Sequence, residues 1–445
     1  MTGGPLTNRS LRLLAAAMAV VLALLVVLLG DVMPPRTAGG LGAICFIAVV
    51  AACSTDLRAV RWRVVGWGLA LQVGLALFIL RFSIGGRRPG YELFAAISAG
   101  VRQFLQFTTA GAEFVFGGLA NPEVMSQLFT GGFVFAFMGL PVIIFVSSFF
   151  SILYYLGVLQ FVVRITARVM MRLMRTSGAE TLSAVANVFM GHTEAPLIVR
   201  PYVERMTQSE LLTVMIGGLA TISGGMMAVY IAIGADPVAL LTTSVMAAPA
   251  GLYLSKIMIP ETGEPLTLGR AETTTHDRVH ANVIDAAAAG ASDGTRLAVN
   301  VGAMLIAFLS LLALADYVLG AMWTGLSLSA IFATVLAPAA LLMGVPAADV
   351  PAVADLLGTK LVANEMVAYL KLTTEYEATM SPLAFALSNF ALTGFANFGS
   401  VGILLGGLGA MAPSRRSDLA RLSGRALLAG FLATMINASI ASMLL

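Results

Sequence analysis

Charged residues are scarce in this sequence of 445 residues and form only 11% of it. An ordinary soluble domain carries about 25%. Hydrophobic residues form 58% of the chain, and its mean hydropathy is +0.91. The composition therefore excludes a soluble globular protein and predicts an all-α polytopic membrane protein. The formal net charge of +3 says little about nucleic acid, and we expect no nucleic-acid partner.

Cysteine and histidine are also rare, with two and three residues respectively. Cys45 and Cys53 lie eight positions apart in one apolar segment, too far along a helix for the usual Cα spacing of a disulfide. His276 and His280 have i, i+4 spacing, but no third ligand accompanies them, as a zinc site would require. The sequence therefore predicts neither a disulfide framework nor a cofactor. A membrane enzyme would need a metal-ligand set or a nucleophile with its base, so we expect no enzyme.

Long apolar runs, in contrast, recur along the whole chain. About 20 apolar residues are needed to cross the hydrocarbon core as a helix. Leu11–Leu29 is long for a signal peptide and lacks a clear cleavage site, so we expect it to be a retained helix. Together the runs predict about nine transmembrane helices, namely Leu11–Leu29, Leu41–Cys53, Val64–Leu80, Gly131–Leu159, Leu211–Ile233, Leu240–Ile257, Leu297–Leu319, Leu383–Leu408 and Arg425–Leu445.

Arginine clusters between these runs predict the orientation. Lys and Arg near span ends mark the cytoplasmic side. The clusters are Arg9/Arg12, Arg58/Arg61/Arg63, Arg164/Arg168/Arg172/Arg175 and Arg415/Arg416/Arg421/Arg425. If all are cytoplasmic, each pair of successive clusters must be separated by an even number of crossings. This condition predicts a plasma-membrane protein with its N-terminus inside, its C-terminus outside and an exposed cytoplasmic loop at Pro260–His280; Arg87 and Arg88 are mild exceptions.

The same condition leaves two moderately apolar stretches that must not cross, Thr181–Tyr202 and Val350–Leu370. We expect both to be re-entrant helical hairpins, and irregular backbone at membrane depth must be covered by protein or a water-filled cavity. The first hairpin carries Glu194 and precedes a glycine-rich span, Gly217–Gly225; the second carries Glu365 and precedes another, Gly394–Ser400. Because the two hairpins enter from opposite sides, they form an inverted repeat, which is typical of secondary transporters.

The repeat predicts a division of the chain into four parts. Residues 1–163 are expected to be N-terminal scaffold helices, and 164–258 the first repeat of a transport domain. Residues 259–320 then form the cytoplasmic loop and a scaffold helix. The second repeat occupies residues 321–445. Interfacial helices are expected between the spans.

Ionisable residues at membrane depth are candidates for function, because each costs at least about 2.5 kcal/mol to insert. Glu194 and Glu365 are the main candidates. Lys360 is either the ion-pair partner of Glu365 or an anchor of the second hairpin. His192 can donate and accept hydrogen bonds at once, and it can titrate near neutral pH. Oxygens that suit a hard monovalent cation come from the side chains of Asn187, Thr193 and Thr221 and the carbonyls of Met190 and Ile222.

Several motifs together resemble the concentrative nucleoside transporter family. They are GHTEAPLIVRPYV (191–203), GGLATISGGMMA (217–228), ANVIDAAAAGAS (281–292), KLVANEMVAYL (360–370) and GFANFGSVGILLGGLGAMAP (394–413). The resemblance runs from about Gly131 to the C-terminus, and more loosely from Leu41. It implies a homotrimer in the lipid bilayer, in which a scaffold holds mobile domains that carry nucleosides by an elevator motion driven by a cation gradient.

The resemblance also implies roles for individual residues. The nucleobase would be surrounded by Gly191, His192, Thr193, Glu194 and Met226. The ribose would bind Glu365, Asn397 and Ser400, with Phe395 lining the pocket. A coupling Na+ would be held by Asn187, Thr193 and Thr221 and by backbone oxygens at Met190 and Ile222.

The sequence departs from the family pattern in three ways. Glutamine is common where His192 stands, Met226 replaces a smaller aliphatic residue, and the span Leu11–Leu29 is additional. The first two leave the preference between purine and pyrimidine open. Proton coupling through His192 or a glutamate is the alternative to sodium. A channel is a further alternative, but the repeated filter residues expected of one are not seen in the sequence.

Overall fold

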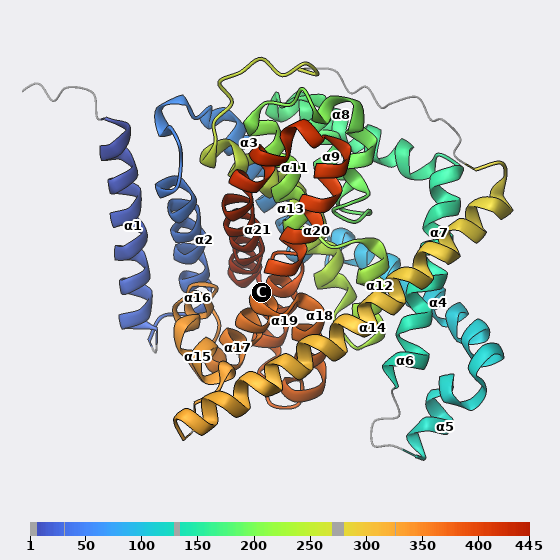
Figure 1. Ribbon diagram of the computed structural model, residues 1–445. Helices are drawn as coiled ribbons and strands as arrows, with labels where there is room; N and C mark the ends of the chain where they lie inside the picture. Colours follow the sequence, from blue (N-terminus) through green and yellow to red (C-terminus); the bar gives the residue numbers. More distant parts are fainter. Residues whose placement is uncertain (1–6, 31, 129–133, 269–279, 325) are drawn as a thin grey trace, which may run out of the picture.

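The computed structural model describes residues 7–30, 32–128, 134–268, 280–324 and 326–445, and these are helical without a β-strand (Figure 1). The predicted all-α membrane fold is confirmed. In the described residues, eight helical segments are long and apolar enough to cross a membrane: Asn8–Leu29, Pro35–Ala52, Trp62–Leu80, Phe135–Tyr155, Gln208–Ala232, Pro237–Met258, Val283–Met322 and Pro413–Leu444. The remaining predicted span, Leu383–Leu408, consists of two shorter helices, α19 (Pro382–Leu392) and α20 (Phe398–Met411). Most of the predicted loop Pro260–His280, including His276, lies outside the described residues.

The central helices are α11 (Gln208–Ala220), α13 (Pro237–Met258) and α21 (Arg416–Leu444). Their spans are 78–83% buried within the protein, whereas the spans of α1 (Asn8–Leu29) and α14 (Val283–Met322) are 17% and 11% buried. An inner helix is therefore surrounded by other helices, while α1 and α14 expose apolar side chains at the periphery. Such an exposed apolar surface suits lipid or another subunit.

The helix α14 has 40 residues and runs diagonally across one face of the molecule (Figure 1). At 1.5 Å per residue it is about 60 Å long, twice the hydrocarbon thickness of about 30 Å, so it must be strongly inclined or extend beyond the membrane. It packs on α7 (Leu140–Tyr155) through small residues. A Cβ added at Gly294 would lie 2.8 Å from the Ile144 Cα, so the two backbones are in direct contact. Ser148 adds a 2.9 Å hydrogen bond from its hydroxyl to the Ala287 carbonyl.

The packing of α2 (Pro35–Ala52) and α3 (Trp62–Leu80) differs from the predicted division of the chain. The Gln72 side chain on α3 donates to Asn437 on α21 over 2.6 Å and accepts from Tyr253 on α13 over 2.9 Å. These buried hydrogen bonds tie α3 to the central helices, and α2 also packs on α21. The prediction that residues 1–163 form one scaffold therefore disagrees with the packing, because hydropathy identifies a span but not the helices that it contacts.

Two further helices lie beside the apolar spans. The helix α8 (Val158–Met174) buries Val163, Ala167 and Met170 on one face and carries arginines on the other, as expected of an interfacial helix. The predicted boundary at residues 163/164 falls inside this helix. The helix α4 (Pro89–Phe116), which has 28 residues, was not predicted from the sequence. Its charged residues Glu92, Arg102 and Glu113 interrupt the apolar run, so no hydropathy window identifies it.

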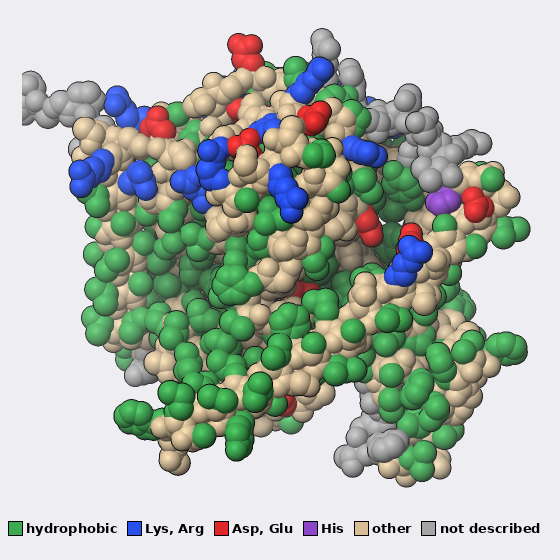
Figure 2. Space-filling model, viewed as in Figure 1, with side chains coloured by type: hydrophobic (Ala, Val, Ile, Leu, Met, Phe, Trp, Pro, Cys, Tyr) green, Lys and Arg blue, Asp and Glu red, His purple; other side chains and the backbone are tan. Residues whose placement is uncertain are grey.

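Both predicted hairpins are present. The first consists of α9 (Gly178–Ala186), the 3-10 helix η3 (Ala195–Val199) and α10 (Arg200–Val203). The second consists of α17 (Val350–Val362) and α18 (Glu365–Lys371), followed by the π-helical turn η5 (Leu372–Tyr376). In Figure 1, α9 lies near the upper end of the molecule and α17 and α18 near the lower end, so the hairpins enter from opposite ends. Figure 2 shows Lys and Arg side chains gathered along the upper edge.

Each hairpin is followed by a broken helix, as the glycine-rich motifs predicted. The first break separates α11 from α12 (Gly224–Ala232), and the second separates α19 from α20. Thr221 and Thr393 occupy the C-cap positions, while Ser223 and Asn397 are the N-caps of the following half-helices and accept hydrogen bonds from backbone N–H groups. These short polar side chains satisfy the terminal backbone groups that a break leaves without helical partners. Below, "the first break" means residues 221–223 and "the second break" residues 393–397.

Candidate functional site

The two breaks touch each other at the centre of the protein. The Phe395 N–H donates to the Thr221 carbonyl over 3.1 Å. Gly394 has a φ of +140°, which favours glycine, and a Cβ there would lie 3.0 Å from the carbonyl oxygens of Leu219 and Ala220. Any side chain at residue 394 would therefore separate the breaks. Polar side chains from both hairpins gather around this contact.

The Glu365 carboxylate is buried and hydrogen-bonded by side chains from α12 and the second break. It is 4% exposed and begins α18 at the turn of the second hairpin. Its Oε1 accepts from the Tyr230 hydroxyl over 2.8 Å, and its Oε2 accepts from the Asn397 side-chain amide over 2.8 Å. Hydrogen bonds to a charged acceptor are stronger than neutral ones. An ionised carboxylate has about four acceptor positions, so Tyr230 and Asn397 do not saturate it and it can accept from a bound molecule with hydroxyl donors.

Asn397 orients this carboxylate because both ends of its side chain are bound. Its amide N–H₂ binds Glu365, while its Oδ1 accepts from the Ser400 backbone N–H over 2.7 Å as the N-cap of α20. Ser400 is one turn further along α20 and is 6% exposed. The structure therefore brings the three residues predicted to bind ribose together.

The tip of the first hairpin lies next to the second break. The His192 ring meets the Phe395 ring edge to face, with centroids 4.8 Å apart. His192 is 8% exposed, and neither ring nitrogen has a hydrogen-bond partner among the described residues. Since a buried polar group without a partner is costly, these nitrogens are candidates for binding a polar ligand.

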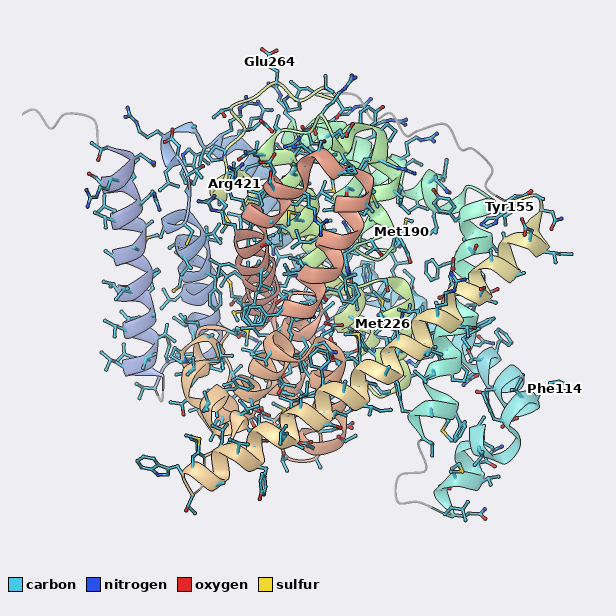
Figure 3. The ribbon with its side chains drawn as sticks, in the orientation of Figure 1. Phe114, Tyr155, Met190, Met226, Glu264 and Arg421 are labelled. Atoms are coloured by element: carbon cyan, nitrogen blue, oxygen red, sulfur yellow. The ribbon has the colours of Figure 1, made fainter. Side chains whose placement is uncertain are left out.

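Glu194 and Met226 complete the predicted nucleobase set. The Glu194 carboxylate accepts from the Gly191 N–H over 3.2 Å and the residue is exposed, unlike Glu365. Met226 is 6% exposed in the first turn of α12, directly after the first break. Figure 3 shows Met190 and Met226 one above the other near the centre of the molecule. A Cβ at Gly191 would lie 3.6 Å from the Ser223 Cβ, so the hairpin tip rests on the first break.

The residues predicted to hold a cation surround the first break. The Asn187 side chain donates to the Ser183 carbonyl over 2.9 Å, but its fully buried Oδ1 has no partner in the described residues. Asn187 and Thr221 both contact Gly217. The Asn187 Nδ2 lies 3.3 Å from the position that a Cβ would take at Gly217, and the Thr221 hydroxyl donates to the Gly217 carbonyl over 2.8 Å. A buried oxygen without a partner, on a side chain that contacts the broken helix, is the kind of ligand that suits a hard cation such as Na+.

The remaining predicted cation ligands are Met190, Ile222 and Thr193, and their contacts differ. Met190 and Ile222 are buried, and a backbone hydrogen bond of 3.0 Å from Gly224 N–H to the Phe189 carbonyl ties the hairpin to the first break. Thr193 packs against α20, with its Cγ2 3.3 Å from the Cβ position of Gly407. Asn187 and Thr221 thus both contact Gly217, whereas Thr193 contacts Gly407 of α20.

Lys360 is an anchor of the second hairpin. Its ammonium donates to the Ala391 carbonyl over 2.8 Å and to the Thr434 hydroxyl over 3.0 Å, and in the described chain it forms no ion pair with Glu365. Of the two roles that the sequence left open for Lys360, the structure supports the anchor.

Tyr230 is the site residue that the sequence analysis missed. Besides binding Glu365, it stacks on Tyr369 with ring centroids 4.5 Å apart. The Tyr369 hydroxyl in turn donates to the Asn389 carbonyl at the end of α19 over 2.9 Å. Helical spacing could have identified Tyr230, because it lies seven residues after the N-cap Ser223 and four after Met226, on the same face of α12.

These features define the class of the protein. Two hairpins enter from opposite ends, two helices break where the hairpins meet, and buried polar groups converge at the breaks. This arrangement is that of a secondary transporter.

Sequence comparisons identify the family. The chain matches the models described as "Na+ dependent nucleoside transporter" N-terminus (residues 41–119) and C-terminus (239–442), and the model described as "Nucleoside recognition" (136–237). It is 43% identical over 413 residues to an "Uncharacterized transporter" of Haemophilus influenzae, covering 91% of this chain and 96% of the relative. It is 40% identical over 441 residues to "Sodium/nucleoside cotransporter 1" of Mus musculus, covering 92% of this chain and 64% of that longer protein.

Solved structures give the same result. The structure "CNTnw in an inward-facing substrate-bound state" superposes with a TM-score of 0.87 at 38% identity, covering 92% of this chain and 98% of that one. A CNTnw variant in an outward-facing state superposes equally well, with a TM-score of 0.87. The chain belongs to the concentrative nucleoside transporter family, whose members are transporters and not enzymes.

Proposed function

We propose that this protein imports nucleosides across the plasma membrane by symport with Na+. The observation that carries this proposal is the direct contact of the two breaks, with a hydrogen-bonded carboxylate on one side and unpartnered polar atoms on the other. A nucleoside has the matching chemistry, since its ribose supplies hydroxyl donors and its base supplies a flat, polar edge. The names of the relatives and of the matched models support the same substrate and ion.

The ribose binds at the second break in this proposal. Glu365 accepts hydrogen bonds from two ribose hydroxyls with the oxygen positions that Tyr230 and Asn397 leave free. Ser400 and Asn397 contact the same sugar, and Phe395 covers it. A deoxy analogue is then penalised because it leaves a buried acceptor without a donor.

The nucleobase binds between the tip of the first hairpin and the start of α12. The unpartnered His192 nitrogens recognise the polar edge of the base, with Gly191, Thr193 and Glu194 beside it and Met226 against its face. Glu194 is accessible to solvent, so its carboxylate is free to contact an entering base. Histidine offers one donor and one acceptor when neutral, so base preference depends on its tautomer.

Na+ binds at the first break, to the side-chain oxygens of Asn187, Thr193 and Thr221 and the carbonyl oxygens of Met190 and Ile222. Binding there joins the hairpin to the broken helix next to the nucleobase residues. Sodium thereby stabilises the conformation that recognises the base, and this couples the two ligands.

Transport requires the site to face each side of the membrane in turn. We propose an elevator motion in which the hairpins, the broken helices and the central helices move together, with α2 and α3 travelling with them. The helices α4, α7 and α14 would form the scaffold, and the apolar surface of α14 suits a homotrimer contact. Solved relatives titled inward-facing and outward-facing support alternating access.

The arginine-rich edge of the molecule supports the orientation inferred from the sequence. Arg421 and Glu264 lie at this upper edge in Figure 3. With this edge on the cytoplasmic side, the N-terminus is inside and the C-terminus is outside. The first hairpin then enters from the cytoplasm and the second from outside.

Uptake into proteoliposomes tests the proposal. Radiolabelled uridine and adenosine are supplied with an inward Na+ gradient in one set and an inward proton gradient in another. We expect accumulation of intact nucleoside only with the Na+ gradient. Accumulation driven only by protons would transfer the coupling role to His192 or a glutamate, and absence of uptake in both sets would refute nucleoside transport.

A further inference from the structure

We propose that the Lys360 ammonium takes, at the second break, the place that Na+ takes at the first. The two breaks would then each have a cation: a bound Na+ at the first, and at the second the side chain of Lys360, which positions the residues around it. This inference rests on the proposed sodium symport, because it assigns different cations to the two halves of that site.

The two breaks have the same local construction. Thr221 and Thr393 are both C-caps, and each hydroxyl donates to the carbonyl four residues earlier, Gly217 over 2.8 Å and Asn389 over 2.7 Å. In each half, a hairpin helix packs on the half-helix that precedes the break, α9 on α11 and α17 on α19. Equivalent groups can therefore be compared directly between the halves.

The two helix ends differ in how their carbonyl oxygens are satisfied. At the end of α19, side chains donate to three consecutive carbonyls: Tyr369 and Thr393 to Asn389, Thr243 to Phe390, and Lys360 to Ala391. At the end of α11, Gly217 is the only one of the last four carbonyls to receive a side-chain hydrogen bond within the described chain. The Asn187 side chain of the first hairpin lies beside Gly217 at this end, and its Oδ1 is an acceptor without a partner in the described chain. The second hairpin instead presents the Lys360 ammonium to the end of α19.

A cation is favoured at this position for electrostatic reasons. The C-terminal end of a helix carries a partial negative charge of about half an electron. Half-helix C-termini of broken helices coordinate Na+ or H+ in secondary transporters. The Lys360 ammonium is fully buried, receives two oxygen ligands and interacts with the charge of Glu365 and the face of Phe431 at 5.4 Å. Its surroundings therefore resemble a cation site made of oxygens, with an aromatic face beside them.

As a consequence, the two halves of the binding site depend on Na+ differently. Lys360 ties α17 to α19 and α21 through its own ammonium, so the ribose residues Glu365 and Asn397 are positioned without added ion. The nucleobase residues are ordered only when Na+ binds. Sodium dependence of nucleoside binding should therefore reflect one ion site.

Sodium titration of nucleoside binding to the purified protein in nanodiscs tests the inference. For the wild type we expect a Hill coefficient for Na+ of about 1. Lys360→Ser removes the ammonium and leaves space, so a second Na+ should be required; the Hill coefficient should rise to about 2 and the half-saturating Na+ concentration at least about tenfold. Lys360→Arg should retain single-ion behaviour. Lys360→Met fills the space without charge, so its binding should be weak at all Na+ concentrations.

Lys371→Met is the matched control, because Lys371 is in the same hairpin but pairs with Asp355 and not with the break. Its Hill coefficient should stay at the wild-type value. A folded Lys360→Ser protein with wild-type sodium dependence, or one that binds no nucleoside at any Na+ concentration, would overturn the inference. If that variant does not fold, the number of ²²Na+ ions taken up per nucleoside by the wild type tests the inference instead. One Na+ per nucleoside supports the inference, and two Na+ per nucleoside contradict it.

The two proposals fail in different ways. If the wild type binds nucleoside without any effect of Na+, the proposed symport is wrong. If Na+ promotes binding but the Lys360 variants behave like the wild type, only the role of Lys360 is wrong.

Discussion

The first and second breaks have similar backbones and very different polar surroundings. At the second break, Glu365 is held by two hydrogen bonds and Lys360 occupies the helix end. In the first hairpin, whose tip rests on the first break, Asn187 Oδ1 and both His192 nitrogens are buried without a partner in the described chain. A protein binds a ligand selectively with groups that it leaves unsatisfied, and it binds a ligand strongly with groups that are already oriented. The comparison suggests that the second break provides a fixed sugar site and the first an ion-dependent base site.

The largest expected effect comes from disrupting the fixed half. Glu365→Gln replaces a charged acceptor by an amide, so the variant loses about 1.5–3 kcal/mol for each of two hydrogen bonds to ribose. We expect uptake in proteoliposomes to fall by at least about 100-fold. Glu375→Gln, an exposed carboxylate after the same hairpin, is the control and should transport normally. Uptake by Glu365→Gln close to that of the control would contradict the ribose assignment.

The contact between the two halves should be the next most sensitive feature. Gly394→Ala places a methyl 2.8 Å from the Thr434 Cγ2 and 3.0 Å from two carbonyl oxygens, at a φ that favours glycine. Overpacking of this kind costs about 1–3 kcal/mol, so we expect a lower melting temperature and strongly reduced uptake. Gly402→Ala has open space around the new methyl and should leave both unchanged. Equal melting temperatures for the two variants would refute close packing of the breaks.

The ion-dependent half should respond through its sodium requirement. Asn187→Ala removes the unpartnered oxygen, and we expect the half-saturating Na+ concentration for uptake to rise about tenfold, equivalent to about 1.4 kcal/mol. The rate at saturating Na+ should change much less. Asn300→Ala, an exposed residue of α14, serves as the control. A lower maximal rate with unchanged sodium dependence would exclude Asn187 as an ion ligand.

The smallest effect is expected at the base-binding tip. His192→Gln exchanges a ring for an amide that also donates and accepts, so sodium coupling should persist. We expect the ratio of uridine to adenosine uptake to change by up to about tenfold, which corresponds to one net hydrogen bond. His280→Gln, near Asp285 at the start of α14, should leave the ratio unchanged. An identical nucleoside profile for His192→Gln and the wild type would remove His192 from the pocket.

Much of the fold could be predicted from the sequence because membrane insertion imposes a simple rule on apolar runs. The hairpins and breaks were also predictable, since Glu194, Glu365 and the glycine motifs are costly inside an apolar chain unless they serve the function. The grouping of α2 and α3 with the central helices was not predictable. It depends on the buried contacts of Gln72, which hydropathy does not contain.

The candidate site was predictable in its residues but not in its connections. Glu365, Asn397 and Ser400 come together as expected. Tyr230 was missed because an aromatic residue in an apolar run resembles a core residue. The partners of Lys360 lie 31 and 74 positions away, so only the tertiary structure distinguishes an anchor from an ion pair.

Hydrogen exchange of the wild-type protein in nanodiscs, measured by mass spectrometry with Na+ or with an equal concentration of choline, tests the difference between the breaks most directly. We predict that Na+ increases protection of amides in residues 187–193 and 217–224, and leaves those in residues 360–367 and 391–397 unchanged. Equal sodium-dependent protection of both sets, or protection of the second set alone, would contradict the account.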